Sequence, residues 1–153
     1  MPDLRTAAAK LLGIELYPDN MPQWAQDLVN QVCRDYELNV PFKFTWRKTN
    51  RQETSGRSWN DDDGVSKSGR KYNAKYAIQI SQGWDEMHCK LVLLHELAHQ
   101  IMPARESHSE AFWKCAYSLY RRYGIDMRYA YECEKNYKDM ARTIGAEFLA
   151  GIW

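Results

Sequence analysis

The sequence predicts an α+β domain, because helical, then strand-like, then helical patterns follow one another along the chain. Apolar residues at 3- and 4-residue steps mark both ends, and alternating apolar residues mark the middle. The length of 153 residues fits one domain, and a hydrophobic content of 44% is enough for a core. We therefore expect a single domain over residues 1–153, with a core at about 20–124 and a helical extension at about 125–153.

The N-terminal part of the chain should contain two helices. A short helix over residues 4–12 would end at Gly13, a residue that favours helix ends. Asn20 could cap the next helix, with Pro22 inside its first turn. Apolar side chains near helical spacing then continue to about Glu37.

The strands are expected in the middle of the chain. Within residues 40–46, the alternating positions 42, 44 and 46 are aromatic. Over residues 73–81, apolar residues alternate with polar ones. Part of 54–59 could form a further strand within a stretch rich in Ser, Gly, Asp and Arg. These segments would form a small sheet.

The C-terminal half should be helical. The pattern predicts a long helix over residues 84–102 and another over 107–123, which Gly124 would end. A last amphipathic helix would cover about 127–149, with a break near Gly145.

Composition limits the compartment more than the partner. A net charge of +1 neither requires nor excludes nucleic acid. The sequence has no signal-peptide core and no apolar run of about 18 residues, so we expect a cytoplasmic protein with no membrane partner, and a monomer. The cysteines form no CxxC pair and are expected to be buried free thiols in a reducing compartment: Cys33, Cys89, Cys115 and Cys133.

The stretch Leu91–Trp113 contains three of the four histidines. His95 and His99 are four residues apart, so on a helix they share one face about 5–6 Å apart and can hold one metal ion. Glu96 is turned about 100° from His95 and is better placed to act on a metal-bound water than to bind the metal. This is the HExxH pattern.

A third ligand follows the proline that ends this helix. Ser107 and Glu110 have the spacing of a capping box, which would make His108 the first residue of the next helix. A side chain there can point back at the preceding helix. Three protein ligands and one open position are typical of catalytic zinc sites, so the sequence predicts Zn²⁺ bound by His95, His99 and His108.

Other interpretations of these residues stay open. Glu106 or Glu110 could replace His108 as the third ligand. His88 lies two turns before His95 on the same face and is more often a packed or partly exposed histidine than a ligand. The stretch could also be a buried helix whose histidines bond to neighbouring carbonyl groups.

The segment "HELAHQIMPARESHSEAFW" resembles the SprT-like (spartan-type) zinc metallopeptidases, with His95, Glu96, His99, His108 and Phe112 matching their motif. The resemblance is specific over about residues 84–117 and architectural over about 20–83. It implies a zincin-like metallopeptidase domain, with a small antiparallel or mixed sheet packed on the HExxH active-site helix. It also implies that the three histidines bind zinc and that Glu96 activates the water.

The resemblance further implies a zinc-dependent endopeptidase acting on proteins, including proteins bound or crosslinked to DNA. Two departures stand out: Ser109 replaces the usual glycine after the third histidine, and no second zinc module follows. Alternatives are a DNA- or protein-binding module with a structural zinc, and a zinc hydrolase of a non-peptide substrate. The sequence does not identify an oxyanion donor; the candidates are Arg105, Tyr120, Tyr123, Tyr129 and Tyr131.

Single-stranded DNA is a possible partner of the middle region. Between residues 47 and 75, eight basic and four acidic residues give a local net charge of +4. A basic groove with stacking aromatic residues is how single strands are held, whereas the plainer alternative is a solvated loop face. The candidate contacts are Arg47, Lys48, Arg51, Arg57, Lys67, Arg70, Lys71 and Trp59.

Overall fold

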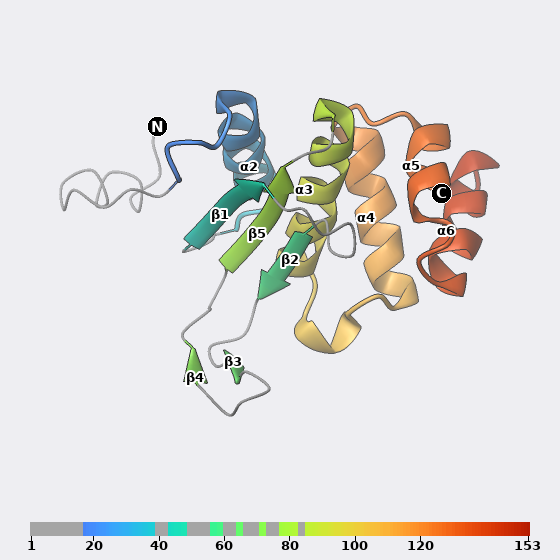
Figure 1. Cartoon of the computed structure of the whole chain (residues 1–153). Coiled ribbons are helices and arrows are strands. Elements are labelled where there is room, and N and C mark those ends of the chain that lie inside the picture. The colour runs from blue at the N-terminus through green and yellow to red at the C-terminus, as the bar shows by residue number, and fades with distance from the viewer. Residues whose placement is uncertain are drawn as a thin grey trace. The chain divides into compact units, whose positions relative to one another are not determined.

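The computed structural model divides the chain into two compact units, Met1–Trp84 and Asp85–Trp153 (Figure 1). Their boundary lies inside the stretch predicted as the core. The predicted helix at residues 4–12 lies outside the described part of the chain. The structure describes residues 17–38, 43–48, 56–59, 64–65, 71–72, 77–82 and 85–153.

Helix α2 (Gln23–Asp35) is the helix of the first unit, and it buries an apolar stripe at 3- and 4-residue steps. Its N-cap is Pro22, so the prediction that Asn20 caps it is wrong. The Asn20 side chain instead donates a hydrogen bond to the backbone carbonyl of Trp46. Nearby, Trp24 and Trp46 meet edge to face with ring centroids 6.0 Å apart. The aromatic contact thus joins α2 to strand residue Trp46, and the hydrogen bond joins the segment just before α2 to the same residue.

The strands of this unit form two small sheets. In the three-stranded sheet, β5 lies between β1, to which it is parallel, and β2, to which it is antiparallel. Strands β3 and β4 pair with each other. The bounds are β1 (Lys43–Lys48), β2 (Gly56–Trp59), β3 (Gly64–Val65), β4 (Lys71–Tyr72) and β5 (Ala77–Gln82).

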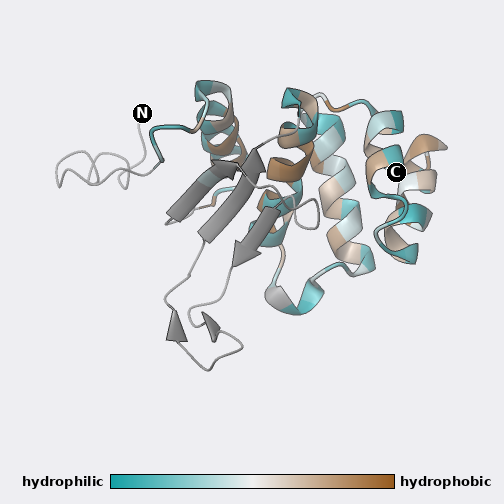
Figure 2. Ribbon diagram, in the orientation of Figure 1, coloured by the Kyte–Doolittle hydropathy of each residue, from teal (hydrophilic) through white to brown (hydrophobic). Residues whose placement is uncertain are grey.

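The second unit is entirely helical (Figure 1). Its central helix is α4, which packs against α3, α5, α6 and the short helix η1. Figure 2 shows a hydrophobic middle for α3 and mixed hydropathy along α4. The bounds are α3 (Glu86–Ile101), η1 (Ala104–Glu106), α4 (Glu110–Arg122), α5 (Met127–Glu134) and α6 (Asp139–Leu149).

The predicted fold class, an α+β zincin-like domain with a sheet packed on the HExxH helix, is wrong. Residues 85–153 contain no strand. Of the strand residues, the structure describes the side chain of Trp46, and the other described side chains belong to helices and their connections. Within this unit α3 packs against α4. The physical reason is that the amphipathic helices of the C-terminal half bury one another's apolar faces.

Helix α3 begins and ends where elementary rules place it. The Asp85 side chain accepts a hydrogen bond from the backbone N–H of His88 at 2.8 Å, which makes it the N-cap. Residues 91–98 are all buried, so the helix is surrounded rather than half exposed. Pro103 follows the C-cap Met102, because proline cannot continue a helix.

Gly124 ends α4 as predicted. It has a φ of +87°, and the N–H of the following Ile125 bonds to the carbonyl of Tyr120 at 2.8 Å. Together with the bond from Gly124 N–H to Arg121, this is a Schellman ending, in which glycine accommodates the left-handed conformation.

The predicted break of the last helix near Gly145 is wrong, because the chain turns between α5 and α6 instead. Gly145 lies within α6 and is needed there for a different reason. A Cβ atom at this position would lie 2.5 Å from the hydroxyl oxygen of Tyr117 and 2.9 Å from Cδ2 of Tyr131. Glycine therefore allows α6 to approach α4 and α5 closely.

No disulfide joins the four cysteines, all of which lie in the described residues. Cys33 and Cys89 are buried, whereas Cys133 is exposed. Among the helices that the structure describes, none is both long enough and apolar enough to cross a lipid bilayer.

Candidate metal centre

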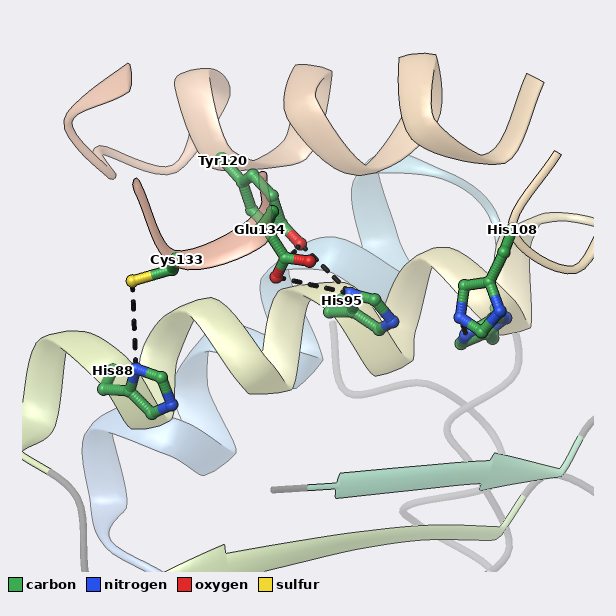
Figure 3. Close-up of polar contacts among 7 residues, drawn as sticks. His88, His95, His108, Tyr120, Cys133 and Glu134 are labelled. Atoms are coloured by element: carbon green, nitrogen blue, oxygen red, sulfur yellow. Dashed lines mark hydrogen bonds and ion pairs between the residues drawn. The ribbon is translucent and has the colours of Figure 1, made fainter. Parts of the chain in front are cut away.

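The three predicted histidine ligands converge in the second unit. His95 and His99 come from consecutive turns of α3, and His108 comes from the connection to α4. One ring nitrogen from each lies within 4.8 Å of the others, so this group could hold a metal ion. Figure 3 shows His108 reaching toward the end of α3 from a separate segment.

The spacing of the nitrogens suits a tetrahedral ion. Nε2 of His99 and Nε2 of His108 are 3.1 Å apart. Two nitrogens that bind one zinc ion at 2.0–2.1 Å in tetrahedral geometry lie about 3.3 Å apart. A distance of 3.1 Å also fits an N–H···N hydrogen bond, but such a pair does not require a third imidazole. His95 supplies that third ring, with its centroid 5.2 Å from the His99 ring and 5.5 Å from the His108 ring.

A buried carboxylate and a tyrosine fix the orientation of His95. Nδ1 of His95 lies 3.5 Å from Oε1 of Glu134, the last residue of α5, and 3.3 Å from the hydroxyl oxygen of Tyr120 on α4. The Tyr120 hydroxyl also donates to Oε1 of Glu134 at 3.3 Å. Figure 3 shows both groups on one side of the His95 ring. A proton held on Nδ1 by the carboxylate leaves Nε2 available to bind a metal.

The electrostatic environment keeps two of the rings neutral. Burial, reinforced by the charge of His95, lowers the pKa of His99 to about 3. Burial and the same charge lower the pKa of His108 to about 4. For His95, burial alone would lower the pKa, but the hydrogen bond and charge of Glu134 and the charge of Glu96 outweigh it and raise the pKa. Neutral imidazoles at His99 and His108 are the form that binds metals.

His108 reaches the site from an uncommon backbone conformation. Its φ is +55°, in the left-handed region that few non-glycine residues adopt. The following Ser109 holds this turn, because its hydroxyl donates to Glu106 and accepts from the N–H of Phe112 at 3.2 Å.

Ser109 is therefore the N-cap of α4, and the predicted capping box of Ser107 and Glu110 is wrong. Both serines fit local capping chemistry, and the contacts with Glu106 select the second one. His108 precedes the helix instead of being its first residue. Ser109 has a φ of −73°, so no glycine is needed at this position.

Two aromatic side chains of α4 line the buried side of the histidines. The Phe112 ring stacks on His99 at a centroid distance of 4.2 Å and an angle of 24°. Trp113 contacts His95 edge to face at 5.4 Å. Both aromatic side chains are fully buried. Apolar packing of this kind limits the rotamers of the rings and raises the strength of charge interactions near them.

The predicted general base, Glu96, is 6% exposed. Its negative charge acts on His95. Burial raises the pKa of Tyr137, and the charges of Glu96 and Glu134 reinforce this shift. Tyr137 itself lies just beyond α5, with its ring centroid 4.9 Å from that of His108, and is 54% exposed. A buried carboxylate and an exposed phenol thus both lie close to the histidine cluster.

The other acidic candidates for the third ligand have different partners. A carboxylate oxygen of Glu106 accepts from the Ser109 hydroxyl at 2.7 Å. Glu110 is exposed and pairs with Lys114 at 2.9 Å. His88 contacts the sulfur of Cys133 at 4.0 Å, two turns before His95 (Figure 3). His108 is the residue that completes the cluster.

The candidate DNA contacts are placed only in part. Arg51, Lys67 and Arg70 lie outside the described residues. The backbone of the others lies in strands: Arg47 and Lys48 in β1, Arg57 and Trp59 in β2, and Lys71 in β4. DNA binding by this region remains a prediction.

Sequence reasoning missed Glu134 and Tyr137. Both lie about 40 residues after the HExxH segment, in a stretch without a motif. The signal for Glu134 is positional, because it is the buried acidic residue of an otherwise amphipathic helix. Tyr120, one of the five candidate oxyanion donors, is fully buried, and its hydroxyl lies 3.3 Å from Nδ1 of His95.

The chain was also compared with known proteins. No protein-family model, curated protein or solved structure matches it.

Proposed function

We propose that this protein is a zinc-dependent endopeptidase of the SprT-like type that hydrolyses peptide bonds in protein substrates. One observation carries the proposal: Glu96 is buried on the same helix as two of three converging histidines. A structural zinc site has no use for a carboxylate beside an open coordination position. The combination favours a hydrolase over a binding module.

The residues present fit zinc. Three imidazole nitrogens are a common ligand set for zinc, and a carboxylate hydrogen-bonded to one ligand, as Glu134 is to His95, is its usual support. When bound, zinc lowers the pKa of a coordinated water toward 7 and polarises a peptide carbonyl.

The chain's own residues would then handle the proton. Glu96 would accept a proton from the attacking water and pass it to the leaving nitrogen of the peptide bond. Burial suits this role, because a carboxylate shielded from bulk water exchanges its proton with the substrate rather than with solvent. Phe112 and Trp113, both fully buried, pack against the histidine rings and exclude water there.

Single-stranded DNA is included in the proposal as an activator, with proteins bound or crosslinked to DNA as substrates. The support is the net charge of +4 over residues 47–75 and the tryptophans within and beside it. Phosphate contacts made by Lys and Arg would make DNA binding weaken as salt concentration rises.

The proposal is tested by cleavage of an unfolded protein substrate by the purified, zinc-loaded chain, with and without single-stranded DNA. We expect Glu96→Gln to lower the rate by about 10²–10⁴-fold while zinc content stays unchanged. Glu110→Gln is the matched control, because Glu110 is an exposed glutamate on α4 paired with Lys114. It should keep full activity.

The outcomes separate the candidate functions. Cleavage only with DNA identifies a DNA-directed protease, and cleavage in both tubes a general endopeptidase. Zinc binding without cleavage in either tube would contradict the proposal and favour a hydrolase of a non-peptide substrate. DNA or protein binding that survives Glu96→Gln, with no turnover in the wild type, would favour the binding module.

A further inference from the structure

A peptide carbonyl that is attacked at the histidine cluster develops negative charge on its oxygen. Enzymes that cleave such bonds place a hydrogen-bond donor about 2.7–3.1 Å from that oxygen. The donor must lie beside the metal ligands and be accessible to substrate.

The tyrosines that the sequence suggested do not meet both conditions. Tyr120 is fully buried, and its hydroxyl is engaged by His95 and Glu134. Tyr123 is only 8% exposed and lies under Arg122. Tyr131 packs against the position of Gly145 and near the ammonium group of Lys135. Tyr129 bonds to Cys133, whose sulfur contacts His88 two turns before His95.

Tyr137 meets both. Its ring contacts His108 at 4.9 Å, His95 at 6.0 Å and Trp113 at 5.9 Å between centroids. Tyr137 is 54% exposed. In the part of the chain that the structure describes, it is the exposed tyrosine whose ring contacts all three of these side chains. A phenol has a pKa near 10 and is a donor at neutral pH.

The backbone also fixes Tyr137 to the site. Its N–H bonds to the carbonyl oxygen of Glu134 at 2.9 Å. The side chain of Glu134 is itself held by His95 and Tyr120. The turn after α5 is thus anchored to a metal ligand, which is the preorganisation that a charge-stabilising donor needs.

We propose that Tyr137 donates a hydrogen bond to the substrate carbonyl oxygen and stabilises the charge that develops there. The inference rests on the proposed endopeptidase function and deepens it by naming a second catalytic residue. It involves no transfer of the phenolic proton.

The test uses the full, zinc-loaded chain and Tyr137→Phe, which keeps the ring that packs on His108 and removes the hydroxyl. We expect kcat to fall about 10²–10³-fold with KM little changed. The affinity for a phosphinic peptide, which mimics the tetrahedral geometry, should fall by a similar factor when measured by calorimetry. Zinc affinity should not change. The matched control is Tyr129→Phe, because Tyr129 contacts Cys133 on the same unit.

The inference fails if Tyr137→Phe binds the phosphinic peptide as tightly as the wild type does. It also fails if the variant loses zinc affinity in proportion to activity, since Tyr137 would then only support the ligands. A wild type that does not cleave protein contradicts the proposed function instead. In that case the affinity for the phosphinic peptide still decides the role of Tyr137.

Discussion

The buried contact between His95 and Glu134 determines which nitrogen of His95 is left to face His99 and His108. A carboxylate that accepts from Nδ1 holds the ring in one tautomer and increases the basicity of Nε2. Glu134 is only 6% exposed, so water screens its carboxylate little. The Tyr120 hydroxyl donates a hydrogen bond to Oε1 of this carboxylate. Burial of Tyr120, reinforced by the negative charge of Glu134, raises the pKa of the Tyr120 hydroxyl well above its ordinary value, which keeps it a donor.

Replacing this carboxylate should weaken the metal site. We expect Glu134→Gln to lower zinc affinity about 10–100-fold, because the amide keeps the shape but not the charge that supports His95. Competition with a chromophoric chelator measures the affinity directly. Glu132→Gln is the control from the same helix, since Glu132 is exposed and pairs with Lys135 at the surface. Equal zinc affinity in Glu134→Gln and the wild type would refute the role of Glu134.

Among elements, the connection from α3 to α4 sets the position of His108, the third candidate ligand. Pro103 ends α3, η1 turns the chain, and Ser109 starts α4, so His108 is fixed from both sides. A left-handed residue costs on the order of 1–3 kcal/mol and persists only where its surroundings hold it. The hydrogen bonds of Ser109 to Glu106 and Phe112 supply this constraint.

Removing the cap should therefore affect both the fold and the site. We expect Ser109→Ala to lower the free energy of unfolding by about 1 kcal/mol, through loss of the N-cap. Zinc affinity should fall as well, because His108 is then less firmly placed. Denaturant unfolding and chelator competition measure the two effects. Ser118→Ala removes a mid-helix serine that bonds to Lys114 and should change neither by much. If Ser118→Ala and Ser109→Ala behave alike, the cap does not hold His108.

Local rules in the sequence predicted the HExxH helix, its stop at Pro103 and the end of α4 at Gly124, because each depends on neighbouring residues. They did not distinguish Ser107 from Ser109 as the cap, since that choice depends on the Glu106 side chain. Contacts between distant segments were beyond them. They predicted that the last helix breaks near Gly145, whereas this glycine allows α6 to approach Tyr117 closely.

At the scale of the molecule, the predicted C-terminal extension is part of the site rather than an appendage. Helices α5 and α6 belong to the same compact unit as α3 and α4. They pack on α4, and α5 carries Glu134 to His95 of the histidine cluster. The stretch Leu91–Trp113 supplies the three candidate ligands, but the carboxylate that supports His95 and the exposed phenol of Tyr137 come from residues 125–153.

Because the candidate ligands come from α3 and from the connection that leads into α4, metal binding should stabilise the packing of these helices. A ligand present at about 1,000 times its Kd adds about 4 kcal/mol to the stability of the folded state. For a chain of this size we expect zinc to raise Tm by roughly 10 °C, and a chelator to reverse the rise. Differential scanning calorimetry with and without zinc measures the shift.

His99→Ala should abolish this zinc-dependent rise in Tm, whereas His88→Ala, which alters the histidine near Cys133, should retain it. Comparing each variant with its own zinc-free form removes the direct effect of the substitution on stability. The same zinc-dependent rise in His99→Ala as in the wild type would mean that the ion binds elsewhere.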